Sequence, residues 1–339
     1  MKPTDFAKLL TAYLSRHLPG QRNVSVNTIK SYSDTFKLFL RFCHDNRGIS
    51  PEYLTIAYVD EELIYSFLSW VENVRKCSIS TRNQRLAAIH AFFRYVQIEA
   101  PEIILQCQRI LAIPFKKHGK PTVSYLTADA LKVILKQPDR TKPAGRRDLA
   151  LLTILYDTGA RVQELIDLVV KDIRLQSPAI VVLTGKGRKT RHVPLMSKTA
   201  KILSDYLVER SLNTPFMREH PVFYNSQRKM LTRAGVGYII NKYMEAVRTI
   251  GKTSLPDKVS PHVFRHTKAM HLLQANVNLV YIRDLLGHVN ISTTEIYAKA
   301  DSEVKRQALE KAYIEVVTDE IPAWSENEGL MNWLQNFCN

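Results

Sequence analysis

Cysteine is scarce in this sequence, and its few cysteines stand far apart. Cys43, Cys77, Cys107 and Cys338 form no C-x-x-C pair among 339 residues, so the pattern argues against a zinc site. Carboxylates do not cluster at metal-ligand spacing either, and we expect no metal. The cysteines are best interpreted as reduced structural thiols, which indicates a reducing compartment.

Long apolar stretches are also missing. No run approaches the roughly 18 residues that a membrane span needs, and the N-terminus lacks the apolar segment of a signal peptide. We therefore expect no membrane partner and a cytoplasmic protein. Internal repeats and low-complexity segments are absent too.

Acidic residues are outnumbered by basic ones. Asp and Glu total 32 against 48 Lys and Arg, a formal net charge of +16. Such a balance favours a polyanionic partner, because each neutralised phosphate releases counterions. The alternative is a basic protein that merely stays soluble.

The first third of the chain has the periodicity of helices. In residues 27–43, apolar side chains recur at steps of three or four, and Asn27 is a plausible N-cap. Residues 60–70, 80–96 and 102–111 predict further helices. We expect residues 1–112 to form a small helical domain.

A basic segment with two prolines and a glycine follows. Residues 113–123 carry Lys116, Lys117 and Lys120 and no acid, which predicts an inter-domain linker. The lysines either line a solvated loop or lie along a nucleic-acid backbone.

Residues 124–317 predict a mixed domain with many helices and a small sheet. Thr127 caps one expected helix, Gly159 ends the helix over residues 146–156, and residues 161–168 form a short one. Residues 179–183 and 191–195 predict two strands. The fold class is therefore mostly α with a small β-sheet, followed by a C-terminal tail, residues 318–339.

Two Arg-containing helix starts stand out in this domain. Ser260 and Pro261 mark a helix N-terminus, so His262 and Arg265 share one face of its first turns, where the helix dipole favours an anion. Arg161 and Glu164 are also three apart. They form either an exposed ion pair or a phosphate-binding arginine held by a carboxylate.

Lys186, His288 and Tyr297 complete the set. Lys186 lies in a Gly-Lys-Gly turn, either solvated or reaching into a groove as a proton donor. Gly287 caps a helix before His288, and Tyr297 follows nine residues later in the next helix. Arginines bind phosphate oxygens, histidines move protons and a tyrosine can form a covalent intermediate, so together they suggest attack on a phosphodiester. His266 and His271 are expected to pack or face solvent.

In order, these residues resemble the tyrosine site-specific recombinase (phage integrase) family. The matching text is T-G-A-R161-V-Q-E164-L, G-K186-G, H262-V-F-R265-H, L-G-H288 and I-S-T-T-E-I-Y297, and the motifs N-T-I-K-S-Y from Asn27 and S-T-R-N-Q-R-L from Ser80 extend it to the first domain. The resemblance covers about residues 5–315, and no expected catalytic residue is missing.

The resemblance implies an enzyme that cleaves and rejoins DNA at specific sites. Tyr297 would attack the scissile phosphate, leaving a 3′-phosphotyrosyl link, while Arg161 and Arg265 clamp its oxygens. Lys186 would protonate the departing 5′-oxygen, with His262 as acid–base partner and His288 as a hydrogen-bond donor. The phosphotyrosine keeps the bond energy, so no cofactor is expected.

The resemblance also implies a DNA clamp that works as an oligomer. The partner would be double-stranded DNA carrying recombination sites, which would associate the protein with the nucleoid. Candidate DNA contacts in the first domain are Arg82 and Arg85, with Lys30 weaker, or these form a solvated helix face. The tail would dock into a neighbouring protomer of a tetramer, or fold back on its own domain.

Four biological roles follow from this pattern. We favour integration, excision or transposition of a mobile genetic element. The alternatives are Xer-like resolution of chromosome or plasmid dimers, type IB topoisomerase-like relaxation, and a DNA-binding protein without chemistry. The sequence identifies neither the target site nor the base that activates Tyr297.

Overall fold

The computed structural model describes residues 2–117, 119, 123–185, 187, 189–251 and 255–300, together with the single positions 329, 332 and 336. The chain divides into two compact units, Met1–Pro121 and Thr122–Asn339. Lys120 and Lys186 lie outside the described residues, and so does the C-terminal tail, apart from those three positions. The docking predicted for the tail therefore stays a prediction. No described helix is long and apolar enough to cross a membrane.

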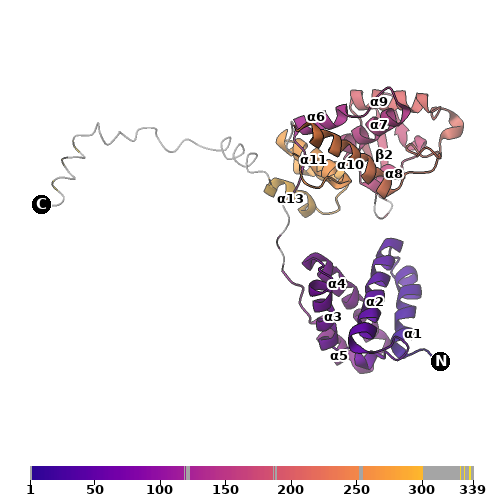
Figure 1. Ribbon diagram of the computed structural model, residues 1–339, viewed down its shortest axis with the longest axis vertical. Helices are drawn as coiled ribbons and strands as arrows, with labels where there is room; N and C mark the ends of the chain where they lie inside the picture. The colour runs from indigo at the N-terminus through magenta and orange to yellow at the C-terminus, as the bar shows by residue number, and fades with distance from the viewer. Residues whose placement is uncertain are drawn as a thin grey trace. The chain divides into compact units, whose positions relative to one another are not determined.

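The first unit is a bundle of helices (Figure 1). Its elements are α1 (Asp5–Ala12), a π-helical continuation Tyr13–Gln21, α2 (Val26–Arg47), α3 (Glu61–Asn73), α4 (Ile79–Glu99) and α5 (Ile104–Leu111), with short 3-10 turns at Ile56–Tyr58 and Pro101–Ile103. Helix α4 packs against α2, α3 and α5. Aromatic edges fill the core: Phe36 meets Phe92 at 5.1 Å and Phe39 meets Phe67 at 5.3 Å, both edge to face.

The predicted starts of two of these helices are wrong by one or two residues. Ser25, and not Asn27, is the N-cap of α2, because its hydroxyl accepts a hydrogen bond from the Thr28 amide. Helix α4 begins at Ile79, where Ser78 caps the Thr81 amide. In both cases the serine before the first periodic residue supplies the cap.

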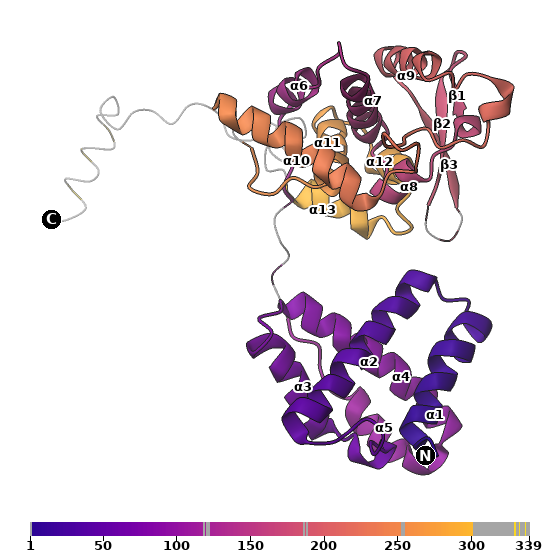
Figure 2. The same ribbon diagram turned by 45° about the vertical axis from the view of Figure 1, so that its right-hand side comes forward.

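The second unit combines helices with one small sheet (Figure 2). Its helices are α6 (Ala128–Lys136), α7 (Pro143–Thr158), α8 (Val162–Ile166), α9 (Ser197–Glu209), α10 (Arg233–Ile250), α11 (Pro261–Gln274), α12 (Leu279–Leu286) and α13 (Ser292–Ala300), with 3-10 turns at Val170–Asp172 and Pro215–Met217. Helix α7 is buried on almost every side and packs against α9 and α11. The predicted fold class, mostly α with a small sheet, is confirmed.

The sheet is antiparallel with the order β1 (Ile173–Arg174), β2 (Ile180–Thr184), β3 (Thr190–Pro194). Val181 pairs with Val193 and Leu183 with Arg191. Both predicted strands are present. Strand β1 was not predicted, because two residues are too few to show the alternating pattern of a strand. Side chains alternate along each strand, so Arg191 lies on the same face of β3 as buried Val193, opposite buried Leu183 of β2.

Candidate active site

A buried carboxylate organises one side of the candidate site. Gly159 is the C-cap of helix α7, and its φ of 58° lets the chain reverse. Arg161 is then the N-cap residue of α8. Glu164 accepts hydrogen bonds from the Arg161 backbone amide at 2.8 Å and from its Nη1 at 2.7 Å. Because Glu164 is only 4% exposed, this is not the solvated surface pair that the spacing also allowed.

Arg191 is a member of the site that the sequence did not reveal. From β3 its guanidinium donates to both oxygens of Glu164, at 3.0 and 2.7 Å, and to the Leu285 carbonyl at 2.8 Å. The neighbouring loops leave little room: a Cβ at Gly185 would lie 2.9 Å from Glu164 Oε1. In the sequence Arg191 is one of several basic residues near a turn, so only its tertiary contacts with Glu164 and Leu285 identify it.

The pKa of the Glu164 carboxyl is set by burial and by two arginines, which act in opposite directions. Burial alone raises this pKa, but the hydrogen bonds and charges of Arg191 and Arg161 outweigh burial and lower it. Glu164 is therefore ionised at neutral pH, and its charge holds both guanidiniums in place.

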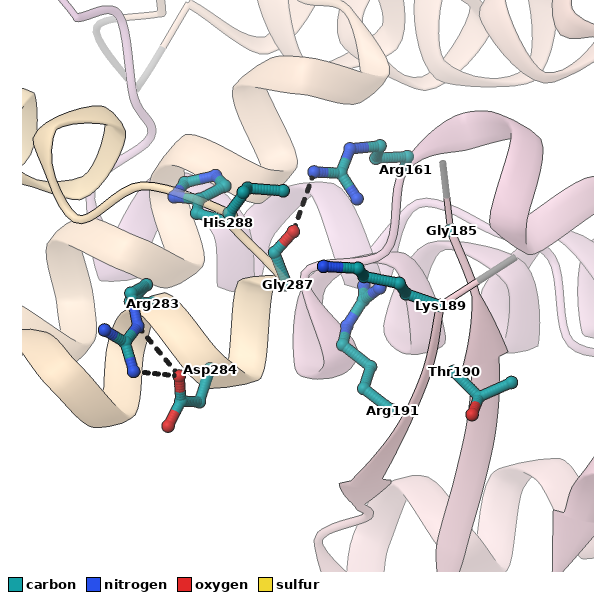
Figure 3. Close-up of a pocket in the computed structure, with 10 residues that line it drawn as sticks. Arg161, Gly185, Lys189, Thr190, Arg191, Arg283, Asp284, Gly287 and His288 are labelled. Atoms are coloured by element: carbon teal, nitrogen blue, oxygen red, sulfur yellow. Dashed lines mark hydrogen bonds and ion pairs between the residues drawn. The ribbon is translucent and has the colours of Figure 1, made fainter. Parts of the chain in front are cut away.

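Arg265 and Arg161 converge on the turn after α12. Buried Arg265, on α11, donates through Nη1 to the Gly159 carbonyl at 2.8 Å and through Nη2 to the Leu286 carbonyl at 2.6 Å. Arg161 Nη2 donates to the next carbonyl, that of Gly287, at 3.1 Å. Figure 3 shows this bond beside His288. Consecutive carbonyls thus bring together two arginines that are 104 positions apart (265 − 161).

The charge of Arg265 survives its burial. Burial and the nearby Arg161 charge lower the pKa of Arg265 to about 10, so the guanidinium remains protonated at pH 7. The adjoining pocket is lined by further cations, Lys189 and Arg283, and by one acid, Asp284, which Arg283 Nη2 already contacts at 2.8 Å. The pocket is therefore suited to an anion.

Tyr297 lies in a row of aromatic rings at the same turn. Its ring stacks on that of His288, with centroids 6.4 Å apart, and lies 5.6 Å from that of His266, which in turn is 6.4 Å from His262. The Tyr297 hydroxyl is 2.9 Å from Nδ1 of His266, and His288 Nδ1 is 2.9 Å from Thr294 Oγ1. His266, expected only to pack or face solvent, therefore contacts the candidate nucleophile.

These rings are neutral at pH 7. Burial lowers the pKa of His266 to about 4, aided by His262 and Arg265. Burial and the positive charges of Arg265, Arg161 and Arg191 lower the pKa of His288 to about 4. Burial raises the pKa of Tyr297, against the opposing effect of the arginines. Tyr297 is 1% exposed, so its hydroxyl is covered in this structure, whereas His262 is exposed.

Family models match both units of this chain. The phage integrase family matches residues 124–303, which hold every described residue of the site, and the phage integrase N-terminal SAM-like domain matches residues 12–100. The chain belongs to the phage integrase family. It is thus a tyrosine recombinase, an enzyme of DNA recombination.

Curated relatives of this tyrosine recombinase extend over nearly the whole chain. It is 37% identical over 311 residues to the putative integrase/recombinase y4rC of Sinorhizobium fredii, covering 91% of this chain and 92% of the relative. It is 30% identical to the tyrosine recombinase XerC of Pelobacter propionicus, covering 90% and 95%.

Solved structures share the recombinase fold. The Tn1549 transposon integrase in complex with transposon right end DNA gives a TM-score of 0.69 at 18% identity, covering 88% of this chain and 97% of that one. The XerH site-specific recombinase bound to palindromic difH substrate gives 0.63 at 23% identity, covering 89% and 83%.

The DNA-contact candidates of the first unit of this recombinase differ in availability. Lys30 and Lys117 are exposed. Arg82 is 4% exposed, and its Nη1 donates to the Pro114 carbonyl at 3.2 Å. Arg85 Nη1 donates to Thr35 Oγ1 at 3.0 Å, and Lys116 Nζ contacts Glu72 Oε2 at 2.7 Å.

Arg82 therefore has a structural task that the sequence did not indicate. Together with Asn83, whose side chain bonds both the amide and the carbonyl of Lys116, it fastens the start of the linker to α4. A buried guanidinium offers little surface to a phosphate, so the DNA prediction is weaker for Arg82 than for exposed Lys30. A polar helical face alone could not distinguish these two uses.

Proposed function

We propose that this recombinase breaks a DNA strand by attack of Tyr297 on a backbone phosphate and rejoins it to a new partner strand. One observation carries the proposal: two guanidiniums donate to the consecutive carbonyls of Leu286 and Gly287. These carbonyls lie at the end of α12, just before the helix that carries Tyr297. Two bound arginines can stabilise the charge that grows on the non-bridging oxygens of the transition state.

The other site residues supply proton transfers and hydrogen bonds. We assign Lys186 as the acid for the departing 5′-oxygen, the exposed His262 as its acid–base partner, and His288 as a hydrogen-bond donor to the phosphate through the nitrogen not engaged by Thr294. The guanidiniums and the lysine provide the positive charge that two metal ions provide in many nucleases. The proposal therefore requires neither a metal nor a nucleotide.

Cleavage also requires a change around Tyr297. A side chain with 1% exposure cannot touch a phosphate that arrives from solvent. Either α13 or the side chains over it must move when DNA binds. The covered phenol is consistent with an enzyme that does not cleave before its site is assembled.

The reaction favours a tetramer on paired sites. Exchange between two duplexes breaks four strands, and each chain offers one Tyr297, so four protomers are needed for one complete exchange. We further propose that the exchange moves a mobile genetic element. Support comes from the higher identity to the putative integrase/recombinase, 37%, than to the XerC relative, 30%.

Covalent capture tests the chemistry even though the target sequence is not specified in advance. The protein is incubated with a library of duplexes that carry randomised cores and a nick. After cleavage, the short fragment between the cut and the nick diffuses away, so the strand cannot be rejoined and the adduct accumulates. DNA that stays bound after denaturation is sequenced. Wild type should give an adduct at one sequence, and Tyr297→Phe should give none.

Each other outcome identifies a different function. Equal DNA binding by both proteins with no adduct from either would indicate a binding protein without chemistry. Adducts at unrelated sequences, with relaxation of any supercoiled plasmid, would indicate a topoisomerase. The captured sequence then decides the biological role: a mobile-element enzyme excises DNA flanked by it and restores a joined donor, whereas a dimer resolvase converts only dimeric circles.

A further inference from the structure

The Tyr297 hydroxyl has one described hydrogen-bond partner, Nδ1 of His266, at 2.9 Å. The phenol ring packs in a small apolar cluster that includes Met270, Ile282 and Leu286. A buried hydroxyl needs an acceptor for its hydrogen. Among the described residues His266 is the acceptor at hand, so the phenol donates and Nδ1 accepts.

The surroundings of His266 keep that nitrogen unprotonated. His262 and Arg265 face it from its own helix, Tyr297 and its stacked neighbour His288 face it from the other side, and none of these is an acid. Burial, His262 and Arg265 lower the pKa of His266 to about 4. Between pH 5 and 8 the imidazole is therefore unprotonated at Nδ1, which is already in contact with the phenol and can accept its proton.

We propose that His266 is the base that takes the phenolic proton of Tyr297 during attack on the phosphate. This rests on the proposed function, in which Tyr297 is the nucleophile. As the bond from Oη to phosphorus forms and the bond from phosphorus to the 5′-oxygen breaks, the phenolic proton moves to Nδ1. The site acid gives a proton to the 5′-oxygen. On rejoining, both protons return.

The geometry suits this step for two reasons. The contact between Oη and Nδ1 is already within the range required for proton transfer. The exposed His262 lies one helical turn before His266, so the transient imidazolium has a polar neighbour near solvent. The opposite role is a clasp, in which His266 holds the phenol away from DNA and must release it before cleavage.

His266→Asn separates the two roles. The asparagine amide oxygen takes the place of Nδ1 as a hydrogen-bond acceptor but cannot accept a proton. The probe is the nicked duplex captured by the wild-type protein, with sulfur in place of the bridging 5′-oxygen at the cleaved bond. A thiolate leaves without an acid, so the single-turnover rate of adduct formation reports on the nucleophile alone.

If His266 is the base, its replacement should change how the rate of adduct formation depends on pH. Between pH 6 and 8.5 the wild-type rate should be flat, because His266 is unprotonated throughout. His266→Asn should be about 10²–10⁴-fold slower at pH 7, and its rate should rise about tenfold per pH unit, since the phenolate must then form without help. A purely structural defect would lower the rate without adding this slope.

His271→Asn is the matched control on the same helix. His271 bonds Tyr156 and the Leu126 carbonyl, which are not residues of the site, so its variant should keep a flat profile. Equal DNA affinity, measured by fluorescence anisotropy, shows that each variant still binds.

Several results would overturn the proposal. A faster His266→Asn enzyme would identify a clasp, and a slower one with a flat profile would identify a structural role. Failure of the proposed function looks different, because wild type then forms no adduct at all. In that case nitrogen NMR of the free protein still decides the contact: His266 should carry its proton on Nε2 down to about pH 4, and a proton on Nδ1 would exclude the base.

Discussion

Glu164→Gln is the most informative single change in the site. The substitution keeps the shape of the side chain but removes its charge and turns one of its two oxygens into an amide donor. Four hydrogen bonds reach the carboxylate, two from Arg161 and two from Arg191. Whichever way the amide turns, its NH₂ group faces two N–H donors.

The expected loss of stability is large for an isosteric change. Removing one partner of a buried ion pair costs about 3–5 kcal/mol. We expect about 3 kcal/mol, the lower end of that range, because the Arg161 side chain is 33% exposed and water can solvate it. Arg191, at 11% exposed, carries most of the cost.

The loss should depend on pH in a defined direction. The pKa of Glu164 is lowered on folding, so its stabilising effect is fully present above the ordinary value of 4.5 and disappears as the pH falls through the folded value. Wild type and Glu164→Gln should therefore differ most above about pH 5.5 and converge in acid. Other carboxylates titrate alike in both proteins and cancel in the difference.

Urea-dependent hydrogen exchange on peptides from β2 and α7 measures this stability. Fluorescence is unsuitable, because the three tryptophans, Trp70, Trp324 and Trp333, all lie outside residues 124–303. Glu209→Gln is the control, since Glu209 also receives two bonds from an arginine but at a more exposed site, and its effect should be several-fold smaller. Equal effects of the two variants, or a Glu164 effect that is constant from pH 3 to 7, would refute the reasoning.

Three further variants probe the same unit. Arg265→Lys keeps the charge but cannot serve two carbonyls and a phosphate, so single-turnover adduct formation should fall at least 100-fold with DNA binding retained; a loss below tenfold would contradict this role. Lys268→Met leaves the Asp157 carboxylate, 5% exposed, without its ion-pair partner. Chemical denaturation should show that the free energy of unfolding falls by about 3 kcal/mol and that adding Asp157→Leu partly restores it. If the effects of the two substitutions simply added, the ion pair would not be the cause. Thr294→Val removes the bond that orients His288 and should slow adduct formation about fivefold, the equivalent of about 1 kcal/mol, whereas Thr294→Ser should keep the wild-type rate.

Local patterns predicted much of the secondary structure, because those patterns act within one turn of chain. Gly159 and Gly287 end helices with φ of 58° and 64°, as their positions indicated. Ser260 and Pro261 do begin α11, although the serine makes no capping hydrogen bond. The strands 179–183 and 191–195 are shifted by one residue at most. Caps and apolar periodicity leave their signal in adjacent residues, so a single sequence is enough to find them.

What the sequence alone determined is the set of chemical groups and their order: two arginines, histidines and a tyrosine in a basic, mostly helical chain. Only the tertiary structure decided how they are used. Arg191, on strand β3, binds Glu164 on helix α8, Arg82 turns inward to hold the linker, and His266 reaches the phenol of Tyr297 from a different helix. These contacts depend on burial and on partners 27 to 32 positions away, for which neighbouring residues along the chain carry no signal.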